Sequence, residues 1–292
     1  MTHSPVQIGP FTCHLIDTGR FMLDGGAMFG VVPKTLWSRQ IPADDKNRIP
    51  MAMRCMLLQS EQTGKIYLID NGSGTKFDEK MTAIYGLDYD HSNLESSLKN
   101  AGFDPADITD IVFTHLHFDH CGGTTYFDAD GALQHTFPNA TYHVNKRHWV
   151  TATNPNKRER ASFLKENIQP IADSGRLQLV DDDVVYEPGF SVFTMEGHTI
   201  GQQLPVIDGG KTKLVFAADL IPTAAHVPLP WVMGYDMRPI ETLAEKEVFL
   251  NRAAEEQWNL FLEHDAFNEV IQLEKTDGKV AVKQSFAFSD LA

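Results

Sequence analysis

Two kinds of hydrophobic pattern alternate along the chain. Apolar runs of four to six residues recur, and several are nearly continuous, which is typical of strands buried on both faces. The predicted strands cover residues 11–16, 54–59, 66–70, 111–114, 140–144, 190–195, 214–218 and 259–263. Stretches with helical spacing lie between them. The pattern therefore predicts a layered α/β fold with the helices outside the sheets.

Two helices have clear boundary signals. Ser92 and Glu95 fit a capping box at the start of the first, and Gly102 can take the left-handed conformation that ends a helix. A longer helix is predicted over residues 241–257, because apolar side chains recur there on one stripe. This stripe consists of Leu243, Leu250, Ala254 and Trp258.

Residues 19–50 interrupt the regular pattern. Glycine and proline are frequent in this segment, so it is interpreted as a long irregular excursion, and loops of that length in a compact domain are usually functional. We find neither an internal repeat nor a low-complexity linker elsewhere. The sequence therefore predicts a single domain over residues 1–292, with the excursion inside it.

Charge and cysteine content narrow the class of protein. The 25 lysines and arginines against 39 acidic residues give a formal charge of −14, which disfavours a nucleic-acid partner. The densest basic run, residues 157–160, is interrupted by Glu159 and is interpreted as a solvated helix face. Three scattered cysteines suit a reducing compartment. Without an apolar stretch of bilayer length, we expect a cytoplasmic protein with no membrane partner.

The most informative stretch is the sequence IVFTHLHFDHCGG at residues 111–123. An apolar strand runs into His115, His117, Asp119 and His120. Imidazole and carboxylate groups at this density are the ligands that a divalent metal site needs. The two glycines that follow let the backbone pass close to the cluster. Surface histidines on a loop are the alternative interpretation of the same run.

This run resembles the His-x-His-x-Asp-His signature of the metallo-β-lactamase superfamily. Three downstream positions are similar to the remaining ligands of that family: His198 in Gly-His-Thr-x-Gly, Asp219 after a strand, and His264 at a strand end. The resemblance covers most of the chain and implies an αββα sandwich of the metallo-β-lactamase fold.

The same resemblance implies two divalent metal ions per chain. In that geometry His115, His117 and His198 bind one ion, Asp119, His120 and His264 bind the other, and Asp219 bridges both. A hydroxide between the ions is the implied nucleophile, and Asp119 carries a proton to the leaving alkoxide. Zinc is favoured by nitrogen and oxygen ligands without thiolate, while cobalt, manganese or iron would be tolerated.

Residues 23–34, Trp37, 231–233 and 264–266 are similar to the YtnP-type quorum-quenching lactonases. This closer resemblance implies an N-acyl homoserine lactone substrate and a homodimer. One position departs from the pattern. Well-known acyl homoserine lactonases resemble each other in having a tyrosine three residues after the bridging aspartate, where this chain has Pro222.

Other candidate residues follow from the same comparison. Asp70 resembles the strand-end aspartate that orients a ligand histidine. Tyr235 and His226 follow Asp219 and are candidates for contact with substrate. Six apolar side chains are candidates for an acyl-chain pocket, although packing in a core or dimer interface explains them equally well. They are Met22, Met28, Phe29, Trp37, Trp231 and Met233.

The sequence therefore predicts a metal-dependent hydrolase that opens a lactone or similar small ester. An organophosphate or aryl-ester hydrolase similar to methyl-parathion hydrolase is the alternative within enzymes, because the same nucleophile attacks phosphorus as well as carbon. A metal-binding scaffold without catalysis is the alternative from a different class. No ligand of the family set is missing, which argues against such a scaffold.

Overall fold

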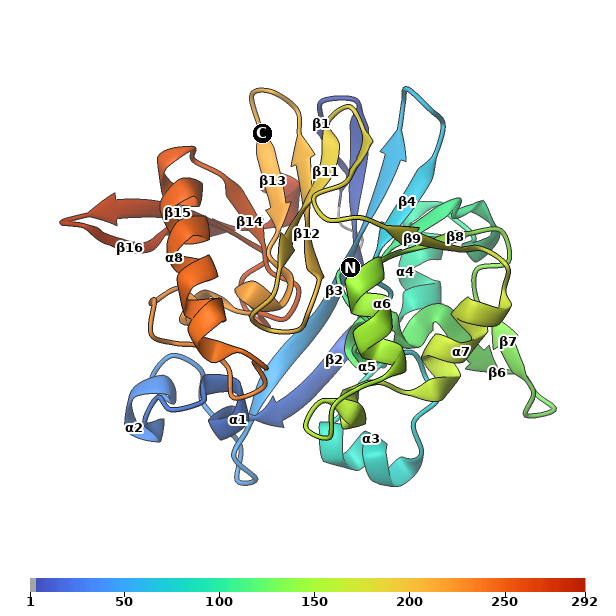
Figure 1. Ribbon diagram of the computed structural model, residues 1–292, viewed down its shortest axis with the longest axis horizontal. Coiled ribbons are helices and arrows are strands. Elements are labelled where there is room, and N and C mark those ends of the chain that lie inside the picture. The colour runs from blue at the N-terminus through green and yellow to red at the C-terminus, as the bar shows by residue number, and fades with distance from the viewer. Residues whose placement is uncertain (1–3, 292) are drawn as a thin grey trace.

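Two seven-stranded sheets lie face to face at the centre of the computed structural model, which describes residues 4–291 (Figure 1). The first sheet has the order β1-β2-β3-β4-β5-β8-β9, and the second runs β10-β11-β12-β13-β14-β15-β16. A buried core that includes Phe11, Leu58, Phe216 and Leu260 draws on both sheets. The predicted sandwich is thus present.

The strands have the following bounds. The first sheet contains β1 (Val6–Ile8), β2 (Phe11–Asp24), β3 (Arg48–Ser60), β4 (Ile66–Ile69), β5 (Asp110–Val112), β8 (Thr141–Asn145) and β9 (Leu177–Val180). The second contains β10 (Val185–Glu187), β11 (Phe190–Met195), β12 (Gln202–Asp208), β13 (Lys213–Phe216), β14 (Asn259–Phe261), β15 (Val270–Thr276) and β16 (Lys279–Phe286). A separate hairpin pairs β6 (Thr125–Phe127) with β7 (Leu133–His135).

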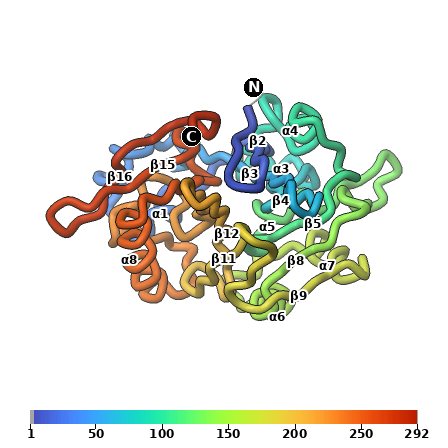
Figure 2. Tube along the Cα trace, turned by 90° about the horizontal axis from the view of Figure 1, so that it is seen from above, coloured from blue at the N-terminus to red at the C-terminus, as the bar shows by residue number. Residues whose placement is uncertain are grey.

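Helices cover the outer faces of the sandwich, one group on each side (Figure 2). Their bounds are α1 (Gly25–Phe29), α2 (Lys34–Trp37), α3 (Glu79–Tyr85), α4 (Leu94–Ala101), α5 (Phe118–Cys121), α6 (Lys146–Thr153), α7 (Lys165–Asp173) and α8 (Pro239–Glu255). Leu98 of α4 and Ile171 of α7 pack in a cluster on the first sheet. Phe249 and Leu250 of α8 pack against the second.

Each of the eight predicted strands coincides with a strand of the structure. They fall in β2, β3, β4, β5, β8, β11, β13 and β14. The continuous apolar runs are explained by burial on both faces, since every residue of β5 and β14 is buried. Strands with more polar residues, such as β16, were not predicted, because most of β16 is exposed.

The predicted irregular excursion over residues 19–50 is wrong at both of its ends. Strand β2 continues to Asp24 and β3 begins at Arg48, so residues 20–24 pair with 48–52 and only the part between them is helical or irregular. The pairing register shifts between Asp17 and Arg20, where Gly19 has a φ of 132°. Gly19 lies at a β-bulge inside a strand and is one of the glycines and prolines on which the loop prediction rested.

Two helix boundaries also differ from their predictions. Asn93, and not Ser92, caps α4: its side chain accepts a hydrogen bond from the backbone N–H of Ser96, and Ser96 caps it in return. Asparagine is as good an N-cap as serine, so the two candidates were not separable by residue type. Gly102 ends this helix in the left-handed conformation, as predicted. Helix α8 begins and ends two residues earlier than expected, at Pro239 and Glu255.

Two parallel strand pairs define the functional edge of the sandwich. Strand β4 runs parallel to β5, and β13 runs parallel to β14. The carboxyl ends of parallel strands meet at one edge of a sheet, where loops bring side chains together. Asp70 follows β4, and the segment starting at Phe113 follows β5. Asp219 and His264 follow β13 and β14 in the same way.

Candidate metal centre

A buried cluster of three histidines and one aspartate lies at the end of β5. The inward nitrogens are Nε2 of His115, Nδ1 of His117 and Nε2 of His198. The His117 atom lies 3.0 Å from that of His115 and 3.2 Å from that of His198. Asp219 Oδ2 is 3.1 Å from His198 Nε2 and 3.8 Å from His115 Nε2. All four ligand atoms thus converge on one point.

A second cluster lies beside the first and shares Asp219 with it. His120 and His264 bring their Nε2 atoms to 3.1 Å from each other. Asp219 Oδ1 is 3.1 Å from the His264 nitrogen and 3.7 Å from the His120 nitrogen, and Asp119 oxygens lie 3.8–3.9 Å from the same two atoms. One carboxylate oxygen of Asp219 therefore faces each cluster.

The outer nitrogen of each histidine meets an acceptor, which fixes the tautomer. Thr114 Oγ donates to Asp70 and so accepts from His115 Nδ1, while His120 Nδ1 donates to Asp70 Oδ2 at 3.0 Å. The other three histidines also donate from their outer nitrogens. His117 donates to Glu159 and His198 to Asp236, while His264 donates to the Ala52 carbonyl. Lone pairs therefore point inward at all five, as metal ligation requires.

These donors fit divalent ions in both spacing and charge. Ligand atoms bound at 2.0–2.1 Å in a tetrahedron lie about 3.3 Å apart, close to the separations observed here. Facing lone pairs repel each other unless a cation lies between them.

Burial opposes the charged form of His198, yet the carboxylates of Asp219 and Asp236 raise its pKa to about 10. Burial also opposes a charge on His264, whose pKa Asp219 raises to about 9. The site is thus rich in negative charge.

Two residues at the centre have unusual backbone conformations. Asp70 has a φ of 56° and Ala218, which precedes Asp219, has a φ of 42°. Non-glycine residues rarely adopt the left-handed region, and such strain concentrates at functional sites. Asp70 is fully buried and accepts hydrogen bonds from both the backbone and hydroxyl of Thr114. Sequence reasoning placed this aspartate beside a ligand histidine, and it lies beside His120.

A cavity of about 190 Å³ opens onto the two clusters. Among the predicted residues it is lined by His117, Asp119, His198, Asp219, His264, Met28, Met233 and Tyr235. Further lining residues, which sequence reasoning missed, are Leu23, Met51, Tyr85, Phe118, Arg158, Glu159, Ala161, Ser162, Gly234 and Met237. The wall is therefore mostly apolar, with a few polar groups.

Four of the other predicted substrate residues lie behind this wall. His226 stacks on Phe29 with ring centroids 4.6 Å apart, and Phe29 also stacks on Trp37 and meets the edge of Trp231. Both nitrogens of His226 are engaged, one with the Met28 carbonyl and one with the Thr223 hydroxyl. Burial lowers the pKa of His226 to about 4. This geometry gives the four side chains a packing role behind the cavity.

Met22 also lies outside the lining of the cavity. It is half-buried on β2 and packs beside Gly86. Side chains on a strand point alternately to opposite faces, so the neighbouring Leu23 lines the cavity and Met22 does not. The pairing of β2 with β3 decides which of these two neighbours faces the cavity, and an irregular loop at residues 19–50 does not predict that pairing.

The interpretation of residues 157–160 as a solvated helix face is wrong in two respects: residues 157–159 form a turn before the short helix Arg160–Ser162, and Glu159 is buried. This side chain is only 2% exposed, and its carboxylate accepts hydrogen bonds from His117, Thr199 and Asn156. Arg158 is exposed but donates to the Gly234 carbonyl across the cavity mouth. Only long-range packing separates these two roles, so the charge pattern of the run carried no signal for them.

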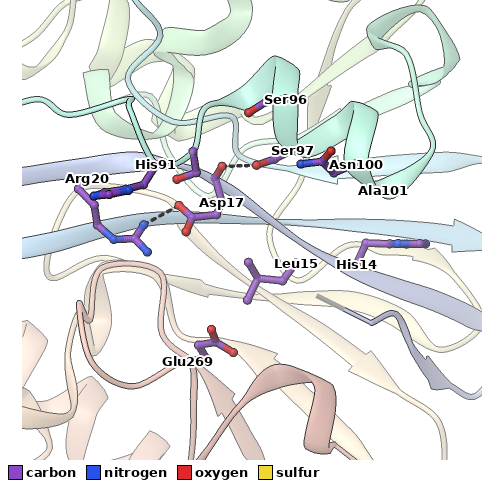
Figure 3. A pocket seen from close by; sticks show the side chains of 11 residues that line it. His14, Leu15, Asp17, Arg20, His91, Ser96, Ser97, Asn100, Ala101 and Glu269 are labelled. Carbon is purple, nitrogen blue, oxygen red and sulfur yellow. Dashed lines mark hydrogen bonds and ion pairs between the residues drawn. The ribbon is translucent and has the colours of Figure 1, made fainter. Parts of the chain in front are cut away.

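A larger polar cavity, of about 460 Å³, lies elsewhere between β2, α4 and the loop before β15 (Figure 3). Asp17 pairs with Arg20 at 2.5 Å inside it, and Ser97 donates to the Asp17 carbonyl. None of the metal-cluster residues lines this second cavity. Substitutions in this second cavity therefore leave the metal-cluster residues in place.

The three cysteines are buried and unpaired, so they form no disulfide among the described residues. Within residues 4–291, no helix combines the length and apolarity needed to cross a bilayer.

The model of the metallo-beta-lactamase superfamily matches residues 53–264. The match covers more than half of the chain and includes all seven cluster residues, so the protein belongs to this superfamily. The predicted family, the αββα fold and the class of metal-dependent hydrolase are confirmed by this match together with the relatives that follow.

Several known proteins are similar to this chain. An N-acyl homoserine lactonase of Bacillus cereus is 26% identical over 211 residues, which cover 69% of this chain and 72% of that protein. A structure of a probable metal-dependent hydrolase from Staphylococcus aureus is 30% identical with a TM-score of 0.85, over 97% of this chain and 100% of the other. The dizinc quorum-quenching lactonase AidC is 23% identical with a TM-score of 0.78, covering 98% of each chain. This last likeness shows the fold alone.

Proposed function

We propose that this protein is a lactonase that opens N-acyl homoserine lactones with the aid of two divalent metal ions. One observation carries the proposal: the two carboxylate oxygens of Asp219 face two adjacent ligand clusters. Relatives named N-acyl homoserine lactonase support the substrate class. Zinc is the favoured metal, because the donors are imidazole and carboxylate, while cobalt, manganese and iron remain compatible with them.

The cluster residues would hold the ions in two sets. His115, His117 and His198 form one, and Asp119, His120 and His264 form the other. Asp219 would belong to both, because its second oxygen faces His264 and His120. Two bound ions supply an activated water near neutral pH and polarise a substrate carbonyl. Asp119 lines the cavity and is the proposed carrier of a proton to the leaving alkoxide.

The cavity wall provides groups for substrate binding. Pro222 cannot donate a hydrogen bond to a substrate carbonyl, but the hydroxyls of Tyr85 and Tyr235 line the cavity and have no hydrogen-bond partner within residues 4–291. We assign this role to Tyr235, which is 36% exposed. Met28 and Met233 are the proposed contacts for the acyl chain, since flexible thioether side chains adapt to apolar ligands.

A panel of acyl homoserine lactones tests the proposal. Protein of measured metal content should open the ring, and the rate should depend on acyl-chain length. The matched control is His117→Ala, which removes one cluster nitrogen. Ring opening no faster than in His117→Ala would reject the lactonase assignment.

The alternatives give different results in the same assay. A higher kcat/KM for a phosphotriester than for any lactone would favour the organophosphate hydrolase. Fewer than about one ion per chain, with no activity after metal addition, would favour the scaffold.

The homodimer and the cytoplasmic location stay proposals. Sedimentation measurements test the first, and fractionation of the source cells tests the second.

A further inference from the structure

A buried lysine on α8 lies beneath one wall of the cavity. Lys246 is 0% exposed, and its ammonium group donates to three backbone carbonyls: His226 at 2.7 Å, Trp231 at 2.8 Å and Pro228 at 3.2 Å. Within residues 4–291, no carboxylate lies at ion-pair distance from it. Burying a lysine is costly unless its donors are satisfied, and here all three have acceptors. Burial lowers the pKa of Lys246 to about 7, against the opposing charge of Asp236, so the place of this lysine among three carbonyls calls for an explanation.

The three carbonyls belong to the segment that builds the cavity wall. Residues 226–236 connect the turn after β13 to α8, and Met233, Gly234 and Tyr235 line the cavity. The same segment ends in Asp236, which holds His198 Nδ1 at 3.0 Å through one oxygen and accepts from the Met233 backbone at 3.1 Å through the other. Its shape therefore affects both the wall and one cluster histidine.

The backbone hydrogen bonds within the segment are turn bonds: Trp231 donates to the Pro228 carbonyl, Val232 to that of Pro230 and Asp236 to that of Met233. It contains no helix or strand after His226, and Gly234 donates to the Ala27 carbonyl of α1. Three carbonyls that point at one buried spot repel each other. The Pro228 carbonyl also accepts from the Trp231 N–H, and Lys246 donates to all three. Only an ammonium group supplies three donors from a single atom, which an apolar or amide side chain cannot do.

We propose that Lys246 is a positioning residue that folds segment 226–236 around its ammonium group and so sets the cavity wall and the orientation of Asp236. The kinetic part of this inference rests on the proposed function, whereas its structural part does not. Lys246 does not line the cavity and would act only through the segment.

Two substitutions and one control test the inference. Lys246→Met removes all three donors at similar length, and Lys246→Gln restores two of them. Leu250→Ala, one turn further along α8, deletes a side chain that is only 2% exposed, belongs to the hydrophobic core and offers the segment no hydrogen-bond donor. The measurements are hydrogen exchange by peptide, metal content and steady-state kinetics on an acyl homoserine lactone.

In Lys246→Met, we expect faster exchange confined to residues 226–236 and a KM raised by about fivefold or more, with a smaller change in kcat. In Lys246→Gln, the exchange in residues 226–236 and the KM should both lie between the values of Lys246→Met and those of the natural protein. Leu250→Ala should lower the melting temperature without either change.

Unchanged exchange in segment 226–236 of Lys246→Met would overturn the inference. A KM in Lys246→Met no higher than that of Leu250→Ala would overturn it as well. If Lys246→Met does not fold, Lys246→Gln decides by the same readouts. If the natural protein opens no lactone, the proposed function fails while the exchange measurement still tests the role of Lys246.

Discussion

The metal clusters and the cavity wall face the same space but are built differently. The seven cluster residues follow strand ends or lie on α5, and none of them is more than 8% exposed. The wall comes largely from loops, at residues 158–162 and 233–237, that meet through contacts such as Arg158 with the Gly234 carbonyl. Strand ends hold ligands at fixed separations, while loops can vary in sequence without changing that geometry. The clusters and the wall are therefore built differently, and they meet where Glu159 contacts His117 and Asp236 contacts His198.

The largest effect should come from the residue shared by both clusters. Asp219→Asn leaves one neutral oxygen where two charged ones face the clusters. We expect loss of at least one bound metal per chain and a fall in kcat/KM of roughly 10³-fold or more. Metal analysis and lactone kinetics measure both. Asp208→Asn, at an exposed ion pair with Lys213, is the control. Full metal content in Asp219→Asn would contradict the assignment of Asp219 to both clusters.

A smaller effect is expected one contact away from the cluster. Asp236→Ala removes the acceptor of His198 Nδ1, so this ring loses its fixed orientation. Partners of this kind are worth about 10- to 100-fold in metal affinity or activity. Competition with a chelator measures the affinity. Asp17→Ala, which breaks the ion pair with Arg20 in the second cavity, should leave it unchanged. Equal chelator sensitivity in the two variants would contradict the assignment.

The wall itself should show a weaker effect that leaves metal binding alone. Tyr235→Phe removes one hydroxyl that lines the cavity. The expected loss in kcat/KM is about 2- to 10-fold, the value of one hydrogen bond, at full metal content. Tyr126→Phe, on the exposed hairpin, is the matched control. A loss of metal in Tyr235→Phe would show that wall and clusters are not separable.

The last effect concerns stability and leaves the chemistry of the site aside. His148 is buried, accepts from the Leu116 backbone and donates to the Ile200 carbonyl, and burial lowers its pKa to about 3. The unfolded chain therefore binds this proton first as pH falls. The stability that His148 contributes is complete above about pH 6.5 and is lost toward pH 3, at up to about 1.4 kcal/mol per pH unit.

Urea unfolding of the metal-free protein at pH 7 and pH 5 measures this dependence. His148→Gln keeps one donor and one acceptor but does not titrate, so its free energy of unfolding should fall less between the two values. His91→Gln changes an exposed histidine and should behave as the natural protein does. If His148→Gln and the natural protein lose the same free energy of unfolding between pH 7 and pH 5, His148 does not cause the pH dependence.

Much of the fold could be predicted because burial on both faces produces continuous apolar runs, as in β5 and β14. The misjudged part was β2, whose second half lies beyond a bulge at Gly19 and follows no simple alternation. A glycine looks the same in a loop and in a bulge. The difference is made by the pairing with β3, which lies more than twenty residues further along the chain.

The candidate site divides in the same way. The four residues from His115 to His120 were found from their types and spacing, and the other three from the resemblance to the superfamily. The structure brings all seven together. Glu159 and Asp236 were missed, because carboxylates of their kind are common and nothing local distinguishes them. Their importance comes from meeting His117 and His198 across 42 and 38 residues of chain.

By itself, the sequence determined the inventory of donors, the strands that carry them and the superfamily to which they belong. These properties are local, because they depend on residue type and short spacing. Tertiary structure alone decided that Glu159 and Asp236 orient His117 and His198, which methionines face the cavity and why a lysine is buried in α8. Such contacts join segments that are distant in sequence, and only the packing of the two sheets and their loops brings those segments together.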